Sequence, residues 1–375
     1  MRSGRWLRFH ATALLVIALE VAVPIASSTA GASVDCVGVV LGSGSNIQQA
    51  VHDHGPGTTF CLSGSYTTTT AIVPKDGDAF VAIGSTNVSN VGTSGVFTGG
   101  KNVTYNGIGI GPSKGDGLRP GDGSIIVNSF IHDNTKCGIS TVGNNLVITG
   151  NDISRNGSAS TVPISQACGL KIRGMNGRDS GAYSTIANNV VHDNVHTALW
   201  VDCNGHDNVF SNNEVYGNTG IALDEETSYR NQWVGNNVHD NGFGSKMQAV
   251  SILDSTGGLV ADNIFTHNYR GIRIWADRRA TVTSPQVGTG CAADGSTGYI
   301  PSGISITGNR FTTEHRIGFA PNGVSVSAAA FDRNCYTVTD MANASWQIAG
   351  DSTATWTQWR AAGQDPTGAA QTIPC

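Results

Sequence analysis

The fold is decided by a phrase that reads NNVVHDN at residues 188–194 and returns as NNEVYGN at 212–218, NNVHDN at 236–241 and DNIFTHN at 262–268. Each copy precedes a short segment in which apolar residues alternate with others: ALWVD at 198–202, GIALD at 220–224, AVSIL at 249–253 and GIRIW at 271–275. Such alternation predicts a β-strand. A repeat of about two dozen residues that contains strands and no helical periodicity predicts a solenoid with one coil per repeat.

The alternation also assigns each side chain to a face, because successive residues of a strand point in opposite directions. We expect the interior to be lined by Leu199, Val201, Ile221, Leu223, Val250, Ile252, Ile272 and Ile274. The outward column then contains Trp200, Asp202, Ala222, Asp224, Ser251, Leu253, Arg273 and Trp275. In the preceding coil, Lys171 and Arg173 fall in register with Trp200 and Asp202, and then with Ala222 and Asp224. This column is the expected working surface.

Asparagines recur at one corner of the repeat: Asn134, Asn156, Asn194, Asn218, Asn241 and Asn268. Asparagine tolerates left-handed backbone and its amide can bond to the next coil, so we expect a structural ladder. Histidines recur beside the same corner: His132, His192, His239 and His267. They lie in a line and do not converge, which predicts a solvated row and not a zinc site.

The ends of the chain differ from the repeats. Residues 1–32 combine arginines, an apolar run and small residues, which is typical of a secretory signal peptide. Residues 33–60 contain an amphipathic helical stretch that is expected to cap the first coil. We assign residues 61–335 to the solenoid and residues 336–375 to a second cap. Insertions at 157–167 and 276–300 are expected to wall a groove.

Composition agrees with this organisation and excludes some partners. The chain has 49 glycines among 375 residues and only 13% charged residues, as expected of many tight turns and short strands. Its net charge of −5 argues against a nucleic-acid partner. Beyond the signal peptide no stretch is apolar enough to span a bilayer, so we expect a secreted, extracellular protein without a membrane partner.

All eight cysteines follow the predicted signal peptide, and an even number in an exported chain predicts disulfides. Cys137 and Cys168 occupy the same place in consecutive coils, where stacking brings their Cα atoms within disulfide range. The other expected pairs are Cys36 with Cys61, Cys335 with Cys375 and, by elimination, Cys203 with Cys291.

Acidic residues interrupt the repeat on adjacent coils, at Asp202 and at Asp224, Glu225 and Glu226. Carboxylates one coil apart repel, so one should keep its proton to higher pH while the other ionises. A protonated acid about 5–5.5 Å from an ionised carboxylate is the arrangement that retaining glycoside hydrolysis requires. The same acids could instead form a solvated charged face or a calcium site. Two outward indoles beside them, Trp200 and Trp275, favour sugar binding.

Three features resemble the exported right-handed parallel β-helix proteins of bacteria: GTTFCL at 57–62, the coils that end in asparagine and WRAAGQD at 359–365. The resemblance implies an all-β, right-handed parallel β-helix of the pectate-lyase-like kind and a carbohydrate-active function. More narrowly, LWVD at 199–202, followed one coil later by Gly220 and an acidic run, is similar to the β-helical β-xylosidases. That likeness implies Asp202 as the nucleophile and Glu225 or Glu226 as the acid/base. Counting from Gly220 favours Asp224 as the stacked acid, whereas counting back from Asn236 favours Glu226.

The sequence therefore predicts a secreted enzyme that acts on a polysaccharide or oligosaccharide. Our preferred interpretation is a retaining glycoside hydrolase that needs no cofactor. Its expected substrate-binding residues are Lys171, Arg173, Trp200, Asp254, Arg273 and Trp275. The first alternative is a polysaccharide lyase, in which a lysine or arginine of the outward column abstracts a proton and calcium neutralises a uronate. The second is a non-catalytic glycan-binding protein.

Overall fold

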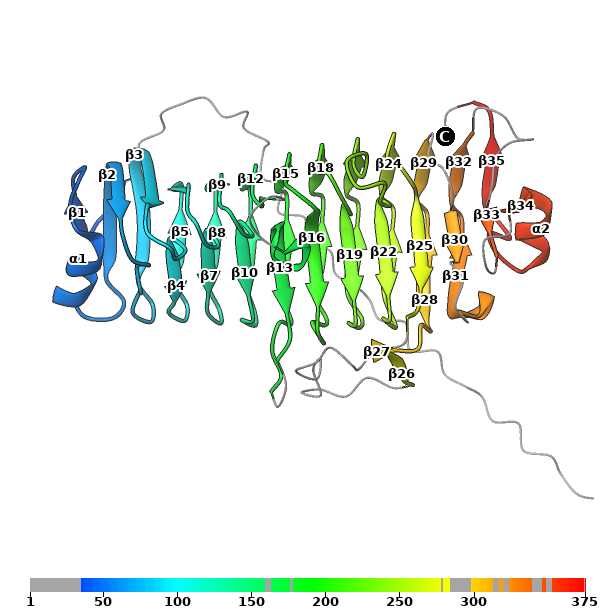
Figure 1. Cartoon of the computed structure of the whole chain (residues 1–375), viewed down its shortest axis with the longest axis horizontal. Coiled ribbons are helices and arrows are strands. Elements are labelled where there is room, and N and C mark those ends of the chain that lie inside the picture. Colours follow the sequence, from blue (N-terminus) through cyan, green and yellow to red (C-terminus); the bar gives the residue numbers. More distant parts are fainter. Residues whose placement is uncertain are drawn as a thin grey trace, which may run out of the picture. The chain divides into compact units, whose positions relative to one another are not determined.

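The computed structural model describes residues 35–158, 163–175, 178–277, 279–283, 298–312, 317–319, 324–338, 346–348, 353–373 and 375. All of them belong to one compact unit, Ser33–Cys375, which is built almost entirely from strands (Figure 1). The predicted signal peptide and Cys291 lie outside the described residues.

Most strands belong to a 22-stranded sheet and an 11-stranded sheet, in which each strand pairs with its counterpart one coil further on. Apart from the antiparallel pair β33–β34, the pairing is parallel. The larger sheet contains β1 (Val39–Leu41), β2 (Thr59–Thr68), β3 (Ala79–Asn90), β5 (Thr104–Asn106), β6 (Gly109–Ile110), β8 (Ile125–Val127), β9 (Phe130–His132), β11 (Val147–Thr149), β12 (Asp152–Ser154), β14 (Thr185–Ala187), β15 (Val190–His192), β17 (Val209–Ser211), β18 (Glu214–Tyr216), β20 (Gln232–Val234), β21 (Asn237–His239), β23 (Leu259–Ala261), β24 (Ile264–Thr266), β28 (Ile304–Thr307), β29 (Arg310–Thr312), β31 (Ala329–Asp332), β32 (Cys335–Thr337) and β35 (Ala369–Gln371).

The 11-stranded sheet carries the candidate site. It contains β4 (Phe97–Gly99), β7 (Leu118–Pro120), β10 (Ile139–Thr141), β13 (Cys168–Arg173), β16 (Thr197–Asp202), β19 (Leu223–Glu226), β22 (Val250–Leu253), β25 (Ile272–Trp275), β30 (Ile317–Phe319), β33 (Trp346–Gln347) and β34 (Thr353–Ala354). A separate pair is formed by β26 (Ala280–Val282) and β27 (Gly298–Tyr299). The parallel stacking of short strands makes the chain an all-β solenoid, as the sequence predicts.

Helices are few and short. Helix α1 (Ile47–Asp53) starts at Asn46, whose side chain accepts a hydrogen bond from the Gln49 amide, and it buries Ile47 and Val51 in the core. Helix α2 (Trp356–Ala361) begins with a capping box and buries Trp359. The 3₁₀ turns are Ile164–Gln166 and Val326–Ala328. Because β1 and β35 join the larger sheet, the coils extend beyond the predicted limits of 61 and 335.

The predicted asparagine ladder is confirmed. In the run from Asn134 to Asn268, the backbone and side-chain amides of one member donate to the side-chain oxygen of the next at 2.9–3.2 Å. A second ladder, which we did not predict, uses an asparagine near the start of each repeated phrase. Its members are Asn151, Asn189, Asn213, Asn236, Asn263, Asn309, Asn334 and finally Asp365. The ladders satisfy buried polar groups at the corners, where sheet pairing is interrupted.

Three predicted disulfides are confirmed: Cys36–Cys61, Cys137–Cys168 and Cys335–Cys375. Cys203 is also disulfide-bonded, but its predicted partner Cys291 lies outside the described residues. Disulfides of this number are typical of an extracellular or periplasmic protein. In the part of the chain that the structure describes, no helix is both long and apolar enough for a membrane span.

The predicted histidine row lies on the larger sheet and is paired rather than free. The imidazoles of His132, His192 and His239 each bond to the aspartate that follows them in the chain, at 2.7–2.8 Å. His267 bonds to Asp240 at 2.5 Å. Among the described residues, no group of three or more His, Cys, Asp or Glu side chains is arranged to hold a metal ion.

Candidate functional site

The outer face of strands β13, β16, β19, β22 and β25 presents two columns of side chains. One column contains Lys171, Trp200, Asp224, Ser251 and Arg273. In the other, Arg173 pairs with Asp202, and Glu226 pairs with Leu253, which pairs with Trp275. Because Val201 pairs with Glu225, the residue that follows Asp202 in its column is Glu226. The structure thus places Asp202 and Glu226 on neighbouring strands of the same face.

The predicted register of the third coil is wrong by two residues. Asp224 stacks on Trp200 and not on Asp202, and Ala222 is buried in the core instead of facing outward. The error arose because the small residue before each strand was used for the alignment. The distance from the corner asparagine gives the observed register, since Leu199 follows Asn194 by the same interval as Leu223 follows Asn218.

Glu225 cannot be the acid/base, because it points into the solenoid. Its neighbours Asp224 and Glu226 take the outward face, and Glu225 itself is 0% exposed. Trp233 Nε1 and Asn231 Nδ2 each donate a hydrogen bond to its carboxyl group at 3.3 Å. Gly258 leaves room for this group, since a Cβ there would lie 2.9 Å from Glu225 Oε2. Burial raises the pKa of Glu225 to about 7, despite these hydrogen bonds.

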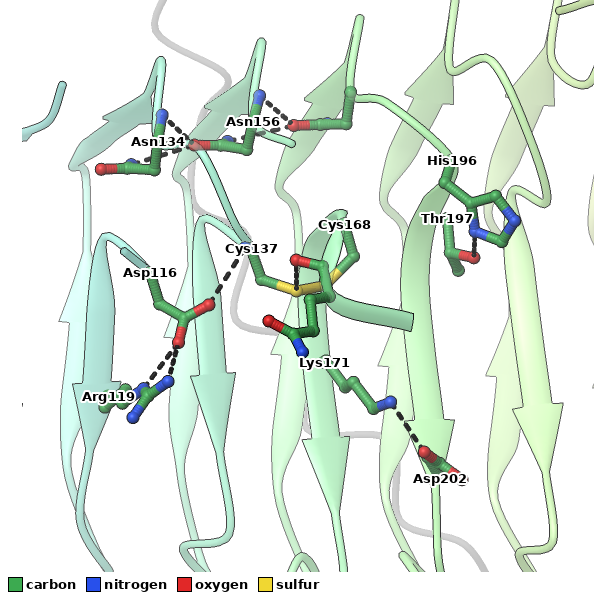
Figure 2. The surroundings of a disulfide bond; sticks show 12 residues. Asp116, Arg119, Asn134, Cys137, Asn156, Cys168, Lys171, His196, Thr197 and Asp202 are labelled. Carbon is green, nitrogen blue, oxygen red and sulfur yellow. Dashed lines mark hydrogen bonds and ion pairs between the residues drawn. A yellow bond between two sulfur atoms is a disulfide. The ribbon is translucent and has the colours of Figure 1, made fainter. Parts of the chain in front are cut away.

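Asp202 and Glu226 differ in their surroundings. Lys171 Nζ lies 2.7 Å from Asp202 Oδ2, an ion pair that is mostly shielded from solvent (Figure 2). Arg279 NH1 lies 2.7 Å from Glu226 Oε1. Burial, followed by the nearby charge of Asp202, raises the pKa of Glu226, and Arg279 opposes that rise. Asp224 is more deeply buried, and burial and then Glu226 raise its pKa well above the ordinary value.

Arg279 also binds two further carboxylates. Its Nε atom lies 3.3 Å from Asp254 Oδ2 and 3.0 Å from Asp277 Oδ2. Burial, and then a hydrogen bond shared with Asp277, raise the pKa of the fully buried Asp254 to about 7. Asp254, which we predicted to bind substrate, is therefore covered by Arg279 and not open to a ligand. Arg279 could not be predicted as a site residue, because it lies in an insertion and not at a repeated position.

Trp200 is not the exposed sugar platform that we expected. It is 5% exposed and packs against the Cys137–Cys168 disulfide. The Lys171 ammonium lies over its ring, 3.3 Å from the ring centre, in a cation–π contact. Trp275 is half-buried, and its Nε1 donates to Ser251 Oγ at 3.2 Å. The Arg273 guanidinium lies 4.3 Å from the Trp275 ring, so these two predicted binding residues lie together.

A groove of about 570 Å³ lies on the same outer face, over strands β4, β7, β10 and β13. Four cationic side chains line it: Arg119, Lys136, Lys171 and Arg173. Asp116 is its acidic residue, and it pairs with Arg119 at 2.5 Å (Figure 2). Lys171 belongs both to the groove and to the ion pair with Asp202, so it joins the groove to the carboxylates. Arg119 and Lys136 were not anticipated, because they precede the segment with the regular repeats.

Comparison with known proteins supports the fold. A family model described as a right handed beta helix region matches residues 164–287. A comparison with curated proteins finds no match. Among solved structures, the chain is similar to the A-module of the mannuronan C-5 epimerase AlgE4 of Azotobacter vinelandii, with a TM-score of 0.53 and 17% identity. That match covers 83% of this chain and 93% of the epimerase module.

Two other solved structures show the same architecture. The Dettilon tailspike protein matches with a TM-score of 0.52 and 16% identity, over 82% of this chain and 64% of the tailspike. A PL6 alginate lyase in complex with a trisaccharide matches with a TM-score of 0.51 and 13% identity, over 80% of this chain and 79% of the lyase. At such identities the likeness is one of fold. The chain is a right-handed parallel β-helix, the architecture that the family model describes and that these solved structures share.

Proposed function

We propose that this chain is a glycan-degrading enzyme that hydrolyses a glycosidic bond, with retention of configuration, at Asp202 and Glu226. Its main support is the strand register, which puts these two residues on neighbouring rungs of one outer face. Neighbouring strands lie about 4.8 Å apart. Retaining glycosidases hold their two carboxyl groups about 5–5.5 Å apart, so the rung spacing suits a direct attack on the sugar by one of them.

The different surroundings of the two acids suggest their roles. Asp202, whose charge is compensated by Lys171, suits the nucleophile that attacks the anomeric carbon. Glu226, whose raised pKa favours the protonated form, suits the acid that gives its proton to the departing glycosidic oxygen. The resulting Glu226 carboxylate would then take a proton from water, and that water would release the sugar from Asp202.

The groove suggests the kind of glycan. Among the described residues that line it, the cations Arg119, Lys136, Lys171 and Arg173 outnumber the one acid, Asp116. Arginine and lysine bind carboxylate and sulfate groups through charge-assisted hydrogen bonds. We therefore propose an acidic polysaccharide that lies along the groove and enters the Asp202–Glu226 pair past Lys171. Secretion by a signal peptide in residues 1–32 is part of the same proposal.

A polysaccharide lyase is the second candidate, and the cationic groove is the observation that favours it. A lyase must neutralise the uronate carboxylate and remove the adjacent proton, and Lys171 or Arg173 could serve in either step. Calcium is the other group that could neutralise the uronate in such an enzyme. The two candidates differ in their products, because elimination leaves an unsaturated sugar that absorbs ultraviolet light and hydrolysis does not.

The test is a panel of acidic and neutral polysaccharides, assayed for new reducing ends and for ultraviolet absorbance, with and without chelator. We expect reducing ends without absorbance, and no effect of chelator. Asp202→Asn and Glu226→Gln should each lower the rate by at least about 100-fold, because each removes a group that acts in the transition state. Glu214→Gln, at an exposed position on β18, is the matched control and should leave the rate unchanged.

The other outcomes each point to a different function. Absorbance that depends on Lys171, with Asp202→Asn and Glu226→Gln still active, would establish the lyase. Binding of an acidic glycan without turnover would establish a non-catalytic glycan-binding protein. Full activity in both acid variants, on any substrate, would remove Asp202 and Glu226 from the mechanism.

A further inference from the structure

Arg279 is the cation in direct contact with Glu226, and it comes from outside the repeated coils. Besides the 2.7 Å contact with Glu226, its backbone amide and its Nε atom both bond to Asp277 Oδ1, at 2.7 and 3.1 Å. The side chain is 19% exposed. A guanidinium fixed by several carboxylates at once has little freedom to reorient, since its donors form a rigid fork.

Asp254 forms an ion pair with Arg279 at 3.3 Å and is itself held firmly by the backbone around it. It is fully buried and adopts a φ of 48°, which lets it turn out of β22. The Asp277 amide donates to Asp254 Oδ1 at 2.8 Å, and the Tyr299 amide donates to the Asp254 carbonyl oxygen at 2.8 Å. Gly298 also packs on it, because a Cβ there would lie 2.7 Å from Asp254 Cβ. The backbone on both sides of Asp254 therefore fixes the oxygen that faces Arg279 Nε.

The charged groups near Glu226 come from strands β13, β16 and β19 and from the insertion. Asp202 of β16 and its own neighbour Asp224 are acidic, whereas Lys171 of β13 and Arg279 are basic. Asp254 and Asp277 reach Glu226 through Arg279, and the strand partner on β22 is the apolar Leu253. Of the two cations, Lys171 is bound to Asp202. Arg279 is thus the group that compensates Glu226 and limits where its carboxyl group can lie.

We propose that Arg279 is a positioning residue that fixes the Glu226 carboxyl group beside Asp202, and that Asp254 in turn orients Arg279. The inference rests on the proposed hydrolytic role of Glu226. A residue of an insertion, and not of a repeated coil, then positions the carboxyl group that donates the proton. Loss of Arg279 leaves the carboxyl group free to rotate and removes a nearby positive charge, so the pKa of Glu226 rises further.

The test compares Arg279→Met, Arg279→Lys and Asp254→Asn with the native protein. Arg279→Met should lower kcat by on the order of 10- to 100-fold with little change in KM, because a mispositioned acid slows the chemical step. It should also move the alkaline limb of the kcat profile upward by at least about half a pH unit. Arg279→Lys should keep kcat and the alkaline limb close to their native values. Asp254→Asn should change both in the same direction as Arg279→Met, but less. Arg230→Met is the control, since Arg230 makes a comparable pair with Asp207.

A second measurement does not depend on activity. The carbon-13 NMR signal of the Glu226 carboxyl group is identified as the one that is missing in Glu226→Gln. Its titration should give a higher pKa in Arg279→Met and a pKa near the native one in Arg279→Lys. Unchanged titration and an unchanged kcat profile in Arg279→Met would overturn the inference. If Glu226→Gln proves fully active, the hydrolytic role of Glu226 is wrong, while the titration still reports whether Arg279 acts on this group. Circular dichroism shows whether each variant is folded. If Arg279→Met is not folded, the smaller shift of the same sign in Asp254→Asn remains the test, and its absence would overturn the inference.

Discussion

Glu225 is a fully buried carboxyl group inside the solenoid, and its titration should affect stability. Its pKa is about 7 in the folded protein, against an ordinary value of 4.5. A raised pKa means that the folded protein holds the proton more tightly than the unfolded chain does. The native fold should therefore lose stability as the pH rises from about 4.5 to about 7, by about 3 kcal/mol in all.

Glu225→Gln tests this directly, because glutamine has the shape of the protonated acid and does not ionise. Relative to the native protein, the variant should gain about 3 kcal/mol in the free energy of unfolding between pH 4.5 and pH 8, measured with urea at each pH. Other groups with a raised pKa are present in both proteins and cancel. The exposed Glu214→Gln should show no such gain, and a gain of zero for Glu225→Gln would contradict the assigned burial.

The sequence identified the acidic run but not which outward member of it lies beside Asp202. An error of two residues keeps every side chain on its face, so it exchanges Asp224 for Glu226 in the column of Asp202 and leaves Glu225 inside. The register of β16 and β19 could have been predicted from their distance to the corner asparagines. The same distance does not predict the register of β22, since the turn between Asn241 and Val250 is longer than the corresponding turns in the coils before it.

The asparagine ladders make each corner depend on the next coil. Asn236 accepts hydrogen bonds from the backbone and side-chain amides of Asn213 and donates to the Phe210 carbonyl oxygen. It is completely buried, so Asn236→Ala leaves these groups without partners and should lower the free energy of unfolding by on the order of 3 kcal/mol. Asn237→Ala, the same change at the adjacent exposed position, should cost less than about 1 kcal/mol. Equal losses in urea unfolding would show that the ladder does not stabilise the fold.

The repeated phrase was sufficient to predict one ladder, because the last asparagine of each copy stands before a strand. It contained the second ladder as well, in Asn189, Asn213, Asn236 and Asn263. These residues look like ordinary turn residues in the sequence, since the position before them adopts positive φ at Asn188, Asn212, Gly235 and Asp262. Only the stacked coils show which residue adopts positive φ in the turn and which one forms hydrogen bonds to the neighbouring coil.

The charge of the whole molecule and the charge of the groove have opposite signs. The chain carries −5, whereas the groove gathers Arg119, Lys136, Lys171 and Arg173. An acidic glycan should therefore bind locally, with an affinity that falls as salt rises. Lys136→Gln should weaken binding about threefold to tenfold at low salt and reduce the salt dependence. Lys246→Gln, at an exposed position elsewhere, should change neither quantity when both are measured by affinity electrophoresis across a salt series.

The sequence predicted the fold well and the working surface less well. A periodic phrase specifies the same coil many times, so an error in one repeat does not change the architecture. The groove and Arg279 are formed by residues that are not repeated from coil to coil. The burial of Trp200 and Asp254 depends on which neighbouring side chains cover them. Neither periodicity nor composition carries that information.

The second ladder has a direction, and Asp365 closes it. At each step the backbone and side-chain N–H groups of one asparagine donate to the side-chain oxygen of the next one toward the C-terminus. At the last step the backbone N–H and the side-chain amide of Asn334 each donate to Asp365 Oδ1. The other oxygen of Asp365 accepts hydrogen bonds from Tyr336 and Trp359. The ladder therefore ends at a residue that only accepts hydrogen bonds through its side chain. Because Asp365 is fully buried and accepts hydrogen bonds at both oxygens, the ladder ends inside the fold and offers a second molecule no asparagine on which to continue it.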